Sequence, residues 1–600
     1  MNKTKKLRPN NKKVRKNANY KTKHMKTKNL VTKGEKSYIK IFSKVWIVKQ
    51  SDITYPEFQQ TYELNKFTRE YSSEGVSLTF GAGGRRSYSA FIGFLRGLHN
   101  MKIGKSDAFC SSHFLSTVSG SSWLLGTFVF ANKNIDKDIL LGESISPKNI
   151  SLTTLKNTNF NMDYNTNKYL GARLIKADIQ KLIIQGKKEN ILPSYLWSYA
   201  CGKLFLEPYG LDKKVMTLNS YDSKNIQEIT GQVTISPNDT APLLISNCSL
   251  LNLTNKNKPR GTTLFQITPY YAGIPNIIYN KDTPFGDENT EQESYVGGQF
   301  QSTFSLGSLR PYLGTDGTQN FNLFDANDNS KNNINLYNLK IEKESCQLFT
   351  LDQLIGISGS SQVSKFTHLA DDITPKYNMW CPYQNNSNVV VPIGDGAYCD
   401  VPGIITLLSR NVKHIITFIT CGSDLKEGIT PDSHADFCLL NILNLFGLYN
   451  EEECINVKPD FNQSNDIQVF KQYDWTFFAQ NLLDTKATGG PVYSRQKMIV
   501  LPNLLCNIVG GYELDLLVIV VQSSSIFNNL LPKSITEQFT DKNSQFYNFP
   551  NISMTTDDPQ TLMSITEETS NLLSSYCDWC INYPPLKATI EEMYKDAKTP

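Results

Sequence analysis

The sequence predicts an α/β protein with a mixed, largely parallel central sheet, flanked by helices and carrying a large insertion. Two early stretches each have the order strand, tight turn, helix. In the first, an apolar run (Gly75–Phe80) ends in glycines, and apolar residues then recur at helical spacing up to Leu98. In the second, a short strand (Phe114–Val118) precedes a strongly apolar helix candidate, Ser121–Ala131.

The same alternation of strands and helices returns after residue 350. Val389–Ile393, His414–Thr420 and Leu516–Val521 are apolar strand candidates, and a helix is expected to begin within Ile404–Leu408. Strands separated by helices favour a parallel sheet, in which ligands bind at the carboxyl ends of the strands.

Three segments that directly follow predicted strands carry groups suited to acyl transfer. The glycine run Gly81–Gly84 joins a strand to a helix, where several backbone N–H groups can point at one anion. Ser119 lies at a second strand-to-helix turn, which is the position of an exposed nucleophile. Asp395 follows the strand candidate at 389–393 and can supply a base.

One folded unit is expected over residues 38–560, between a tail (1–37) and a C-terminal helical extension (561–600). Within this unit, residues 132–340 are polar and Asn-rich and hold few periodic runs, so we predict an insertion or cap there. Asn327–Lys340 is low in complexity and is predicted to be a surface loop.

The tail is strongly basic. It holds 12 Lys and 2 Arg against one acidic residue, a net charge of +13, while the whole chain carries +5 and the remainder therefore −8. Such a composition predicts disorder, as a solvated extension or as a segment attracted to an anionic membrane at about 1 kcal/mol per basic residue. Nucleic-acid binding is disfavoured because the tail is poor in aromatic residues and the rest of the chain is acidic.

Three motifs together resemble the catalytic domain shared by cytosolic phospholipase A2 and fungal phospholipase B (lysophospholipase). Gly81-Ala82-Gly83-Gly84-Arg85-Arg86 resembles the family's Gly-Gly-Gly-x-Arg element, and Val118-Ser119-Gly120-Ser121-Ser122-Trp123 resembles its Gly-x-Ser-Gly-Ser-x-Trp element. Asp395-Gly396-Ala397 resembles the Asp-Gly-Gly/Ala element that patatin-like lipid hydrolases share. The order and spacing agree with the family over residues of about 70 to 525.

The resemblance implies a Ser–Asp dyad without histidine. Ser119 would attack an ester carbonyl of a glycerophospholipid or lysophospholipid, and Asp395 would take its proton and later activate water. Arg86 would bind the lipid phosphate, for which a guanidinium is well suited, while Arg85 is expected to point outward. The backbone N–H groups that would form the oxyanion hole belong to three glycines, namely Gly83, Gly84 and Gly120.

Two departures from the family pattern keep a second hypothesis open. Thr117 stands where the family has a glycine before the nucleophile, and Ala82 stands in the glycine run. These positions motivate the alternative of a catalytically silent relative that binds lipid or a partner protein.

Ser358, His414 and His434 are alternative catalytic residues, but the sequence disfavours each of them. Ser358, in Gly356-Ile357-Ser358-Gly359-Ser360, fits a short nucleophile pattern, yet no Trp follows and the glycine run is far along the chain. His414 and His434 follow Asp395 in the order of an α/β-hydrolase triad, but the nucleophile-elbow glycines of that fold are replaced at 117 and 121.

Neither a cofactor nor a metal is expected. Cys577-Asp578-Trp579-Cys580 is a lone Cys-x-x-Cys, which disfavours a zinc site, and no calcium-dependent docking domain fits before residue 70. No apolar run reaches the roughly 18 residues needed to span a bilayer, and no signal peptide is expected. We therefore expect a cytoplasmic protein that associates reversibly with membranes, with a phospholipid substrate and no inferred protein partner.

Overall fold

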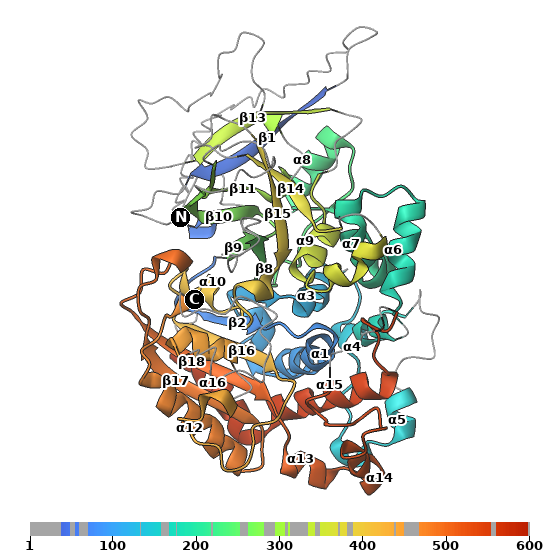
Figure 1. Cartoon of the computed structure of the whole chain (residues 1–600), viewed down its shortest axis with the longest axis vertical. Coiled ribbons are helices and arrows are strands. Elements are labelled where there is room, and N and C mark those ends of the chain that lie inside the picture. The colour runs from blue at the N-terminus through green and yellow to red at the C-terminus, as the bar shows by residue number, and fades with distance from the viewer. Residues whose placement is uncertain are drawn as a thin grey trace, which may run out of the picture.

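The computed structural model is built around one large twisted sheet with helices on both faces (Figure 1). The strand order is β12-β13-β1-β11-β10-β9-β8-β5-β2-β16-β18-β17, with β15 also paired to β8 and β14 paired to β15. The structure describes residues 38–47, 55–58, 70–131, 134–157, 167–175, 177–217, 220–251, 262–280, 294–305, 310–311, 334–342, 348–369, 373–380, 388–436, 440–448, 467–553, 558 and 560–597. The predicted basic tail (1–37) lies outside these residues.

The central part of the sheet is parallel, which confirms the predicted fold class. Neighbouring strands β8, β5, β2, β16 and β18 all run in one direction. Their bounds are β2 (Val76–Phe80), β5 (Phe114–Val118), β8 (Leu243–Leu251), β16 (His414–Thr420) and β18 (Glu513–Val521). These strands read as near-continuous apolar runs because both faces of the sheet are covered.

Antiparallel strands extend the sheet on both sides and occupy the upper part of Figure 1 and its lower left edge. They are β1 (Tyr38–Ile47), β9 (Thr262–Ile267), β10 (Tyr271–Asn280), β11 (Ser294–Ser302), β12 (Arg310–Pro311), β13 (Ile334–Glu342), β14 (Lys376–Trp380), β15 (Asn388–Asp395) and β17 (Val492–Ile499). Two short two-stranded sheets pair β3 (Lys102–Ile103) with β4 (Ser106–Asp107) and β6 (Val215–Met216) with β7 (Thr234–Ile235).

The expectation of few regular elements within 132–340 is wrong. This range supplies β8, which lies beside the central strand β5, and the antiparallel strands β9 to β12. Part of the predicted surface loop, from residue 334 on, forms β13, which pairs with β1 over its full length. The sequence signal was weak because the strands are separated by long, polar, Asn-rich stretches of sequence.

Helices cover the two faces of the sheet. Among the longest are α1 (Gly84–Asn100), α3 (Gly120–Phe130), α12 (Asp474–Ala487), α15 (Glu567–Asn582) and α16 (Pro584–Asp596). The other α-helices of the described residues are α2 (Ala108–Ser111), α4 (Lys137–Leu141), α5 (Leu152–Asn157), α6 (Ile179–Lys188), α7 (Pro193–Cys201), α8 (Ser220–Thr230), α9 (Leu351–Ser358), α10 (Ile405–Leu408), α11 (Leu440–Leu443), α13 (Ser525–Leu530) and α14 (Lys533–Thr536).

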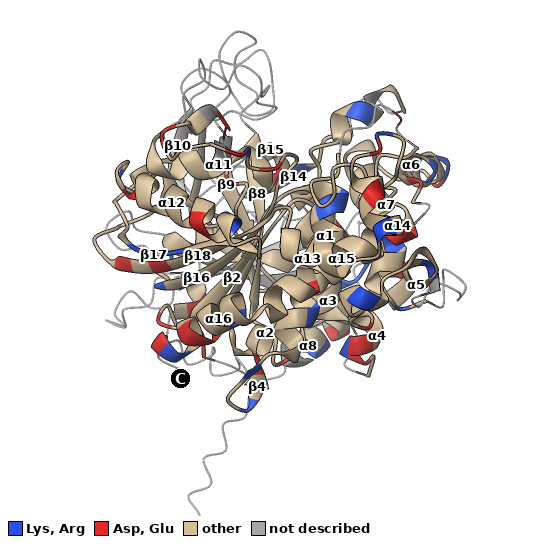
Figure 2. Ribbon diagram, turned by 90° about the horizontal axis from the view of Figure 1, so that it is seen from below, with Lys and Arg blue, Asp and Glu red and all other residues tan. Residues whose placement is uncertain are grey.

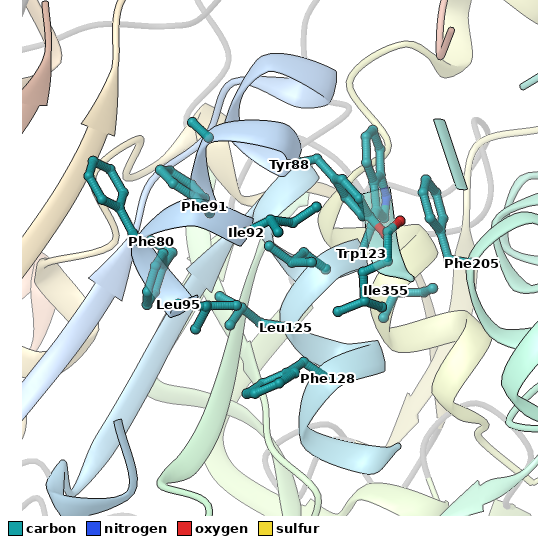
Figure 3. Packing of buried hydrophobic residues seen from close by; sticks show 14 of the residues in the cluster. Phe80, Tyr88, Phe91, Ile92, Leu95, Trp123, Leu125, Phe128, Phe205 and Ile355 are labelled. Carbon is teal, nitrogen blue, oxygen red and sulfur yellow. The ribbon is translucent and has the colours of Figure 1, made fainter. Parts of the chain in front are cut away.

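Two hydrophobic clusters fill the space between the sheet and its helices. Alternate residues of β18 belong to opposite clusters, with Leu517 and Ile519 on one face and Leu516 and Val518 on the other. Figure 3 shows the first cluster, in which Phe80 and Phe91 meet edge to face and Trp123 stacks on Phe205 with ring centroids 5.2 Å apart. This packing fixes α1 and α3, the two helices that follow the predicted catalytic turns.

Helices α15 and α16 fall in the range predicted as a helical extension, but α15 is packed into the fold. It lies against α1 so closely that a methyl group on Gly93 would come within 2.8 Å of the Ser574 carbonyl carbon. Cys577 and Cys580 of α15 are buried free thiols within the first cluster.

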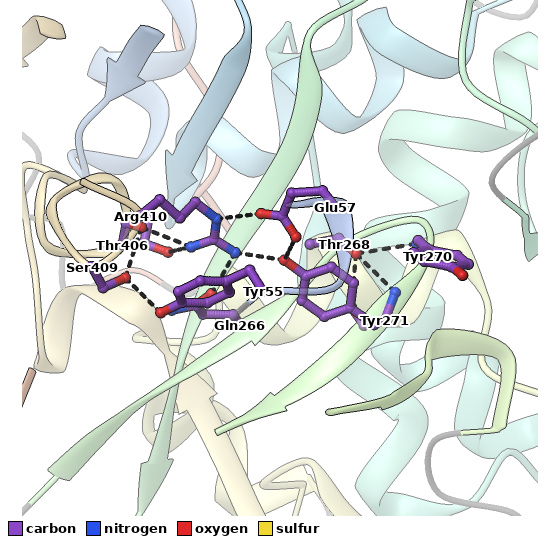
Figure 4. A network of polar contacts seen from close by, with 9 residues as sticks. All are labelled: Tyr55, Glu57, Gln266, Thr268, Tyr270, Tyr271, Thr406, Ser409 and Arg410. Carbon is purple, nitrogen blue, oxygen red and sulfur yellow. Dashed lines mark hydrogen bonds and ion pairs between the residues drawn. The ribbon is translucent and has the colours of Figure 1, made fainter. Parts of the chain in front are cut away.

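A buried ion pair fastens the short segment at 55–58 to the sheet (Figure 4). The Arg410 guanidinium donates to Glu57 Oε1 at 2.7 Å, and neither side chain is exposed. It also donates to Gln266 Oε1 (2.9 Å) and to the Tyr271 hydroxyl (2.7 Å), and it stacks on the Tyr55 ring at 3.9 Å. Every partner of this cation is therefore a buried group of the fold.

Charged residues lie mainly on the outer helices and loops, while the central strands carry few (Figure 2). In the described ranges no helix combines the length and apolarity that a membrane span requires. The same ranges contain no group of three or more His, Cys, Asp or Glu side chains arranged to hold a metal ion.

Candidate active site

Ser119 and Asp395 meet because the C-terminal ends of two strands, β5 and β15, come together along one side of β8. β5 pairs with β8 up to Val118 opposite Asn247, and β15 pairs with the next residues of β8, with Asp395 opposite Cys248. β9 occupies the other side of β8. β15 runs antiparallel to β8, so the expectation that Asp395 ends a strand of the parallel set is wrong, although it does end a strand.

The Ser119 hydroxyl donates to Asp395 Oδ2 at 2.9 Å. Ser119 is 5% exposed and Asp395 is 0% exposed, so the pair lies in a nearly dry environment. Burial raises the pKa of Asp395 to about 6, while hydrogen bonds from Ala397, Ser119 and Ser361 oppose that rise. A carboxyl with this pKa is ionised at neutral pH and still basic enough to accept a proton.

Ser119 has the strained backbone of a nucleophile elbow, with φ 58° and ψ −129°. Thr117 and Ser121, which replace the usual glycines, are both accommodated. The Ser121 hydroxyl lies 2.6 Å from the Phe80 carbonyl and accepts the Val118 amide at 2.8 Å, so it joins the ends of β2 and β5. The buried Thr117 hydroxyl accepts a hydrogen bond from Ser122 at 2.9 Å.

The glycine turn uses its amides in two different ways. The Gly81 amide donates to the Phe418 carbonyl (3.0 Å) and the Ala82 amide to the Val401 carbonyl (2.9 Å), so both anchor the turn. Among the described residues, the amides of Gly83 and Gly84 take part in none of the hydrogen bonds that fix the turn. Ala82 therefore stands at an anchoring position, where glycine is not required.

Gly83 and Gly84 both adopt positive φ, at 148° and 53°, which disfavours any other residue. The turn also touches the elbow directly. A methyl group on Gly120 would lie 2.7 Å from the Gly84 Cα atom, so the two turns are in backbone contact. The glycine turn is therefore adjacent to the turn that carries Ser119, through Gly84 and Gly120.

The loop after Asp395 is shaped by a second buried carboxylate, Asp400. It accepts the amides of Gly403 (3.1 Å) and Ile405 (2.7 Å), and burial raises its pKa to about 7. This loop carries Val401, whose carbonyl anchors Ala82. The loop that follows the base therefore also supports the glycine turn.

The two arginines after the glycine turn contact the C-terminal part of the chain. Arg86 is 8% exposed and donates to the Ile552 carbonyl at 3.0 Å. Arg85, which was expected to point outward, instead donates to the carbonyls of Thr561 (2.8 Å) and Ser564. The phosphate-binding role of Arg86 stays a prediction.

The disfavoured candidates occupy different places. His414 lies at the start of β16, at the opposite end of that strand from the glycine turn, with its Nδ1 3.8 Å from Asp515 Oδ2. Ser358, expected to be remote, lies beside Ser119: its fully buried hydroxyl accepts the Ser119 amide at 3.2 Å.

Sequence reasoning missed the supporting roles of three polar residues. Ser358 and Ser361 contact Ser119 and Asp395, and Asn247 lies beneath the turn that carries Ser119. The Ser361 amide donates to Asp395 Oδ2 at 3.0 Å. Asn247 Nδ2 donates to the Ser116 hydroxyl (2.8 Å) and the Thr117 carbonyl (3.1 Å) beneath the elbow. The small-residue motif at 356–361 was the available signal, but it was weighed only as a rival nucleophile.

Comparisons with known proteins give matches among solved structures. No protein-family model matches the chain, and no curated protein matches it. Among solved structures it is similar to human GIVD cytosolic phospholipase A2, with 12% identity and a TM-score of 0.42, over 88% of this chain and 61% of that chain. It is also similar to that human protein in complex with a methyl gamma-linolenyl fluorophosphonate inhibitor and terbium chloride, with 12% identity and a TM-score of 0.39, over 89% of this chain and 61% of the other.

This chain therefore spans about 61% of the length of the structures it matches. The TM-scores are too low for the likeness to support an argument. The function proposed below depends on the residues of this chain.

Proposed function

We propose that this protein is a serine acyl hydrolase that releases fatty acid from glycerophospholipids or lysophospholipids by a Ser119–Asp395 dyad. The observation that carries the proposal is the 2.9 Å hydrogen bond from a serine on a strained strand-to-helix turn to a buried carboxylate. The choice of lipid as substrate rests on the resemblance of the three sequence motifs.

The reaction runs in two halves. Ser119 Oγ attacks the ester carbonyl carbon while its proton passes to Asp395, and the oxyanion is bound by the amides of Gly83, Gly84 and Gly120. Collapse of the tetrahedral intermediate expels the alcohol, which takes the proton from Asp395 and leaves an acyl group on Ser119. A water molecule then loses a proton to Asp395, attacks the acyl carbonyl and releases the fatty acid, with the proton returned to Ser119.

Arg86 is assigned to the lipid phosphate in this proposal. The assignment rests on the match of Arg86 to the arginine of the glycine motif, and a planar guanidinium is well suited to phosphate oxygens. We also propose that the basic tail is attracted to an anionic membrane surface. This part of the proposal rests on the composition of residues 1–37, which lie outside the described ranges.

The test uses the full chain and phospholipid vesicles. Ser119→Ala and Asp395→Ala are each expected to abolish fatty-acid release, measured by mass spectrometry of the lipid products, while circular dichroism shows an unchanged fold. A fluorophosphonate probe is expected to form an adduct on Ser119. Ser360→Ala is the matched control, because the Ser360 hydroxyl donates to the Ile357 carbonyl and contacts neither catalytic group.

The alternative is a catalytically silent relative that binds lipid. It predicts vesicle binding without product and no adduct on Ser119 in folded protein. Undiminished release by Ser119→Ala would contradict the proposed mechanism.

A further inference from the structure

The turn that ends α9 contacts both members of the proposed dyad. The amide of Ser119 donates to Ser358 Oγ at 3.2 Å, and the amide of Ser361 donates to Asp395 Oδ2 at 3.0 Å. The turn lies far from both in the sequence, 239 residues after Ser119 and 34 before Asp395. Its two contacts fall on the nucleophile's backbone and on the base itself.

Ser358 acts as an acceptor at the elbow. Its hydroxyl donates to the Asn247 carbonyl at 2.8 Å, so its oxygen is free to accept the Ser119 amide, and it lies 2.7 Å from the Ser122 hydroxyl. The side chain is fully buried, so water does not replace it. The strained backbone conformation of Ser119 persists only where several contacts with the surrounding structure hold it in place. The hydrogen bond to Ser358 is one of these contacts.

Ser361 acts on the base. Its amide donates a hydrogen bond to Asp395 Oδ2, and the amide and the hydroxyl both lower the pKa of that carboxyl. Hydrogen bonds to a carboxylate favour its charged form. The second carboxylate oxygen, Oδ1, accepts the Ala397 amide at 2.9 Å, so the turn and the Asp395 loop together fix the carboxylate plane.

We propose that Ser358 and Ser361 are positioning residues of the hydrolase: Ser358 holds the Ser119 backbone in its strained conformation, and Ser361 orients the Asp395 carboxylate. This inference rests on the proposed function and extends it, because it assigns the motif at 356–361 to the support of the dyad. It also explains why that motif is built from small residues. A methyl group on Gly359 would overlap the Trp123 ring, for example at 2.6 Å from its Cζ2 atom, so the turn must approach α3 closely.

Few other titratable groups bear on Asp395. Cys248 of β8 lies directly opposite it in the sheet, and burial raises the pKa of that thiol well above its ordinary value, so it is uncharged near neutral pH. From its own loop Cys399 is nearby, with Sγ 3.2 Å from the Ser249 hydroxyl, which itself donates to the Asp395 carbonyl. Burial and hydrogen bonds, rather than a neighbouring charge, therefore set the Asp395 pKa.

The test measures the rate at which a fluorophosphonate probe labels Ser119 in the full chain, over a pH series that spans the Asp395 pKa of about 6. Ser361→Ala keeps the amide and removes the hydroxyl, which lowers the pKa of Asp395, so the midpoint of the rate profile is expected to move about half a unit to one unit to higher pH. Ser361→Thr keeps the hydroxyl and is expected to restore the wild-type midpoint.

Ser358→Ala is expected to behave differently. Its rate on the high-pH plateau should fall about five- to tenfold, which corresponds to the loss of one hydrogen bond, while the midpoint stays at the wild-type value. Should Ser358→Ala fail to fold, Ser358→Cys keeps a side chain of similar size with a weaker acceptor, and a lowered plateau is again expected. Ser360→Ala is the control for both, with an unchanged plateau and midpoint.

An unmoved midpoint in folded Ser361→Ala, or a wild-type plateau in the folded Ser358 variant, would overturn this inference. A loss of stability alone, measured by thermal unfolding without the two kinetic changes, would likewise show that the turn only supports the fold. These failures differ from failure of the proposed function, in which the wild-type protein itself takes up no label on Ser119.

Discussion

Replacement of Gly120 by alanine tests whether contact between the two catalytic turns is required. The added methyl group would lie 2.7 Å from the Gly84 Cα atom, whereas ordinary contacts begin near 3.4 Å. The glycine turn and the elbow must therefore separate by at least about 0.7 Å, and a displacement on the order of 1 Å at a reacting centre costs about 10²-fold in rate. We expect Gly120→Ala to lower the rate of Ser119 labelling by about that factor, measured by mass spectrometry with a fluorophosphonate probe.

The matched control lies on the same helix. Gly126→Ala places a methyl group 2.5 Å from Cγ2 of Ile355, so it also overpacks the core, at about 1–3 kcal/mol, but it touches neither turn. We expect this variant to lose stability in urea unfolding and to keep its labelling rate. Folded Gly120→Ala that labels at the wild-type rate would refute the argument that the contact between the turns positions the oxyanion hole.

Three further results are expected. Because burial raises the pKa of Asp395 to about 6, kcat/KM should fall as pH decreases through that value and the base becomes protonated; a profile that is flat down to pH 5 would contradict this role. Glu57→Ala leaves the Arg410 cation buried without its carboxylate and should cost about 3–5 kcal/mol in urea unfolding, so an unchanged midpoint would show that the ion pair is dispensable. Gly93→Ala should push α15 away from α1, because the new methyl group meets the Ser574 carbonyl, and calorimetry should show a Tm below that of the wild type; an equal Tm would contradict the close helix contact.

The parallel half of the sheet could be predicted from sequence because its signals are local. β2 and β5 are short apolar runs that end at glycine or serine turns, and the helices after them show clear apolar patterns. β16 and β18 are continuous apolar runs because both of their faces are buried. Such patterns need no knowledge of distant partners.

The remaining features depend on pairing between distant segments. β13 pairs with β1 almost 300 residues earlier, and its Asn-rich sequence resembles a loop when its partner is unknown. Similarly, Ser358 resembles a nucleophile motif, and only its burial beside Ser119 reveals a supporting contact. The engagement of Arg85 and Arg86 by carbonyls near residues 552–564 also has no local signature.

The head-to-head meeting of β5 and β15 on β8 has a consequence for folding. The nucleophile elbow belongs to the parallel half of the sheet, whereas Asp395 arrives from an antiparallel strand 276 residues later. Loop closure over such a separation is entropically costly and slow, so β2, β5 and β8, which are closer together in the sequence, can pair before Asp395 is in place. Uptake of a fluorophosphonate probe during refolding would therefore time the closure of the whole sheet, and it would lag behind the recovery of secondary structure.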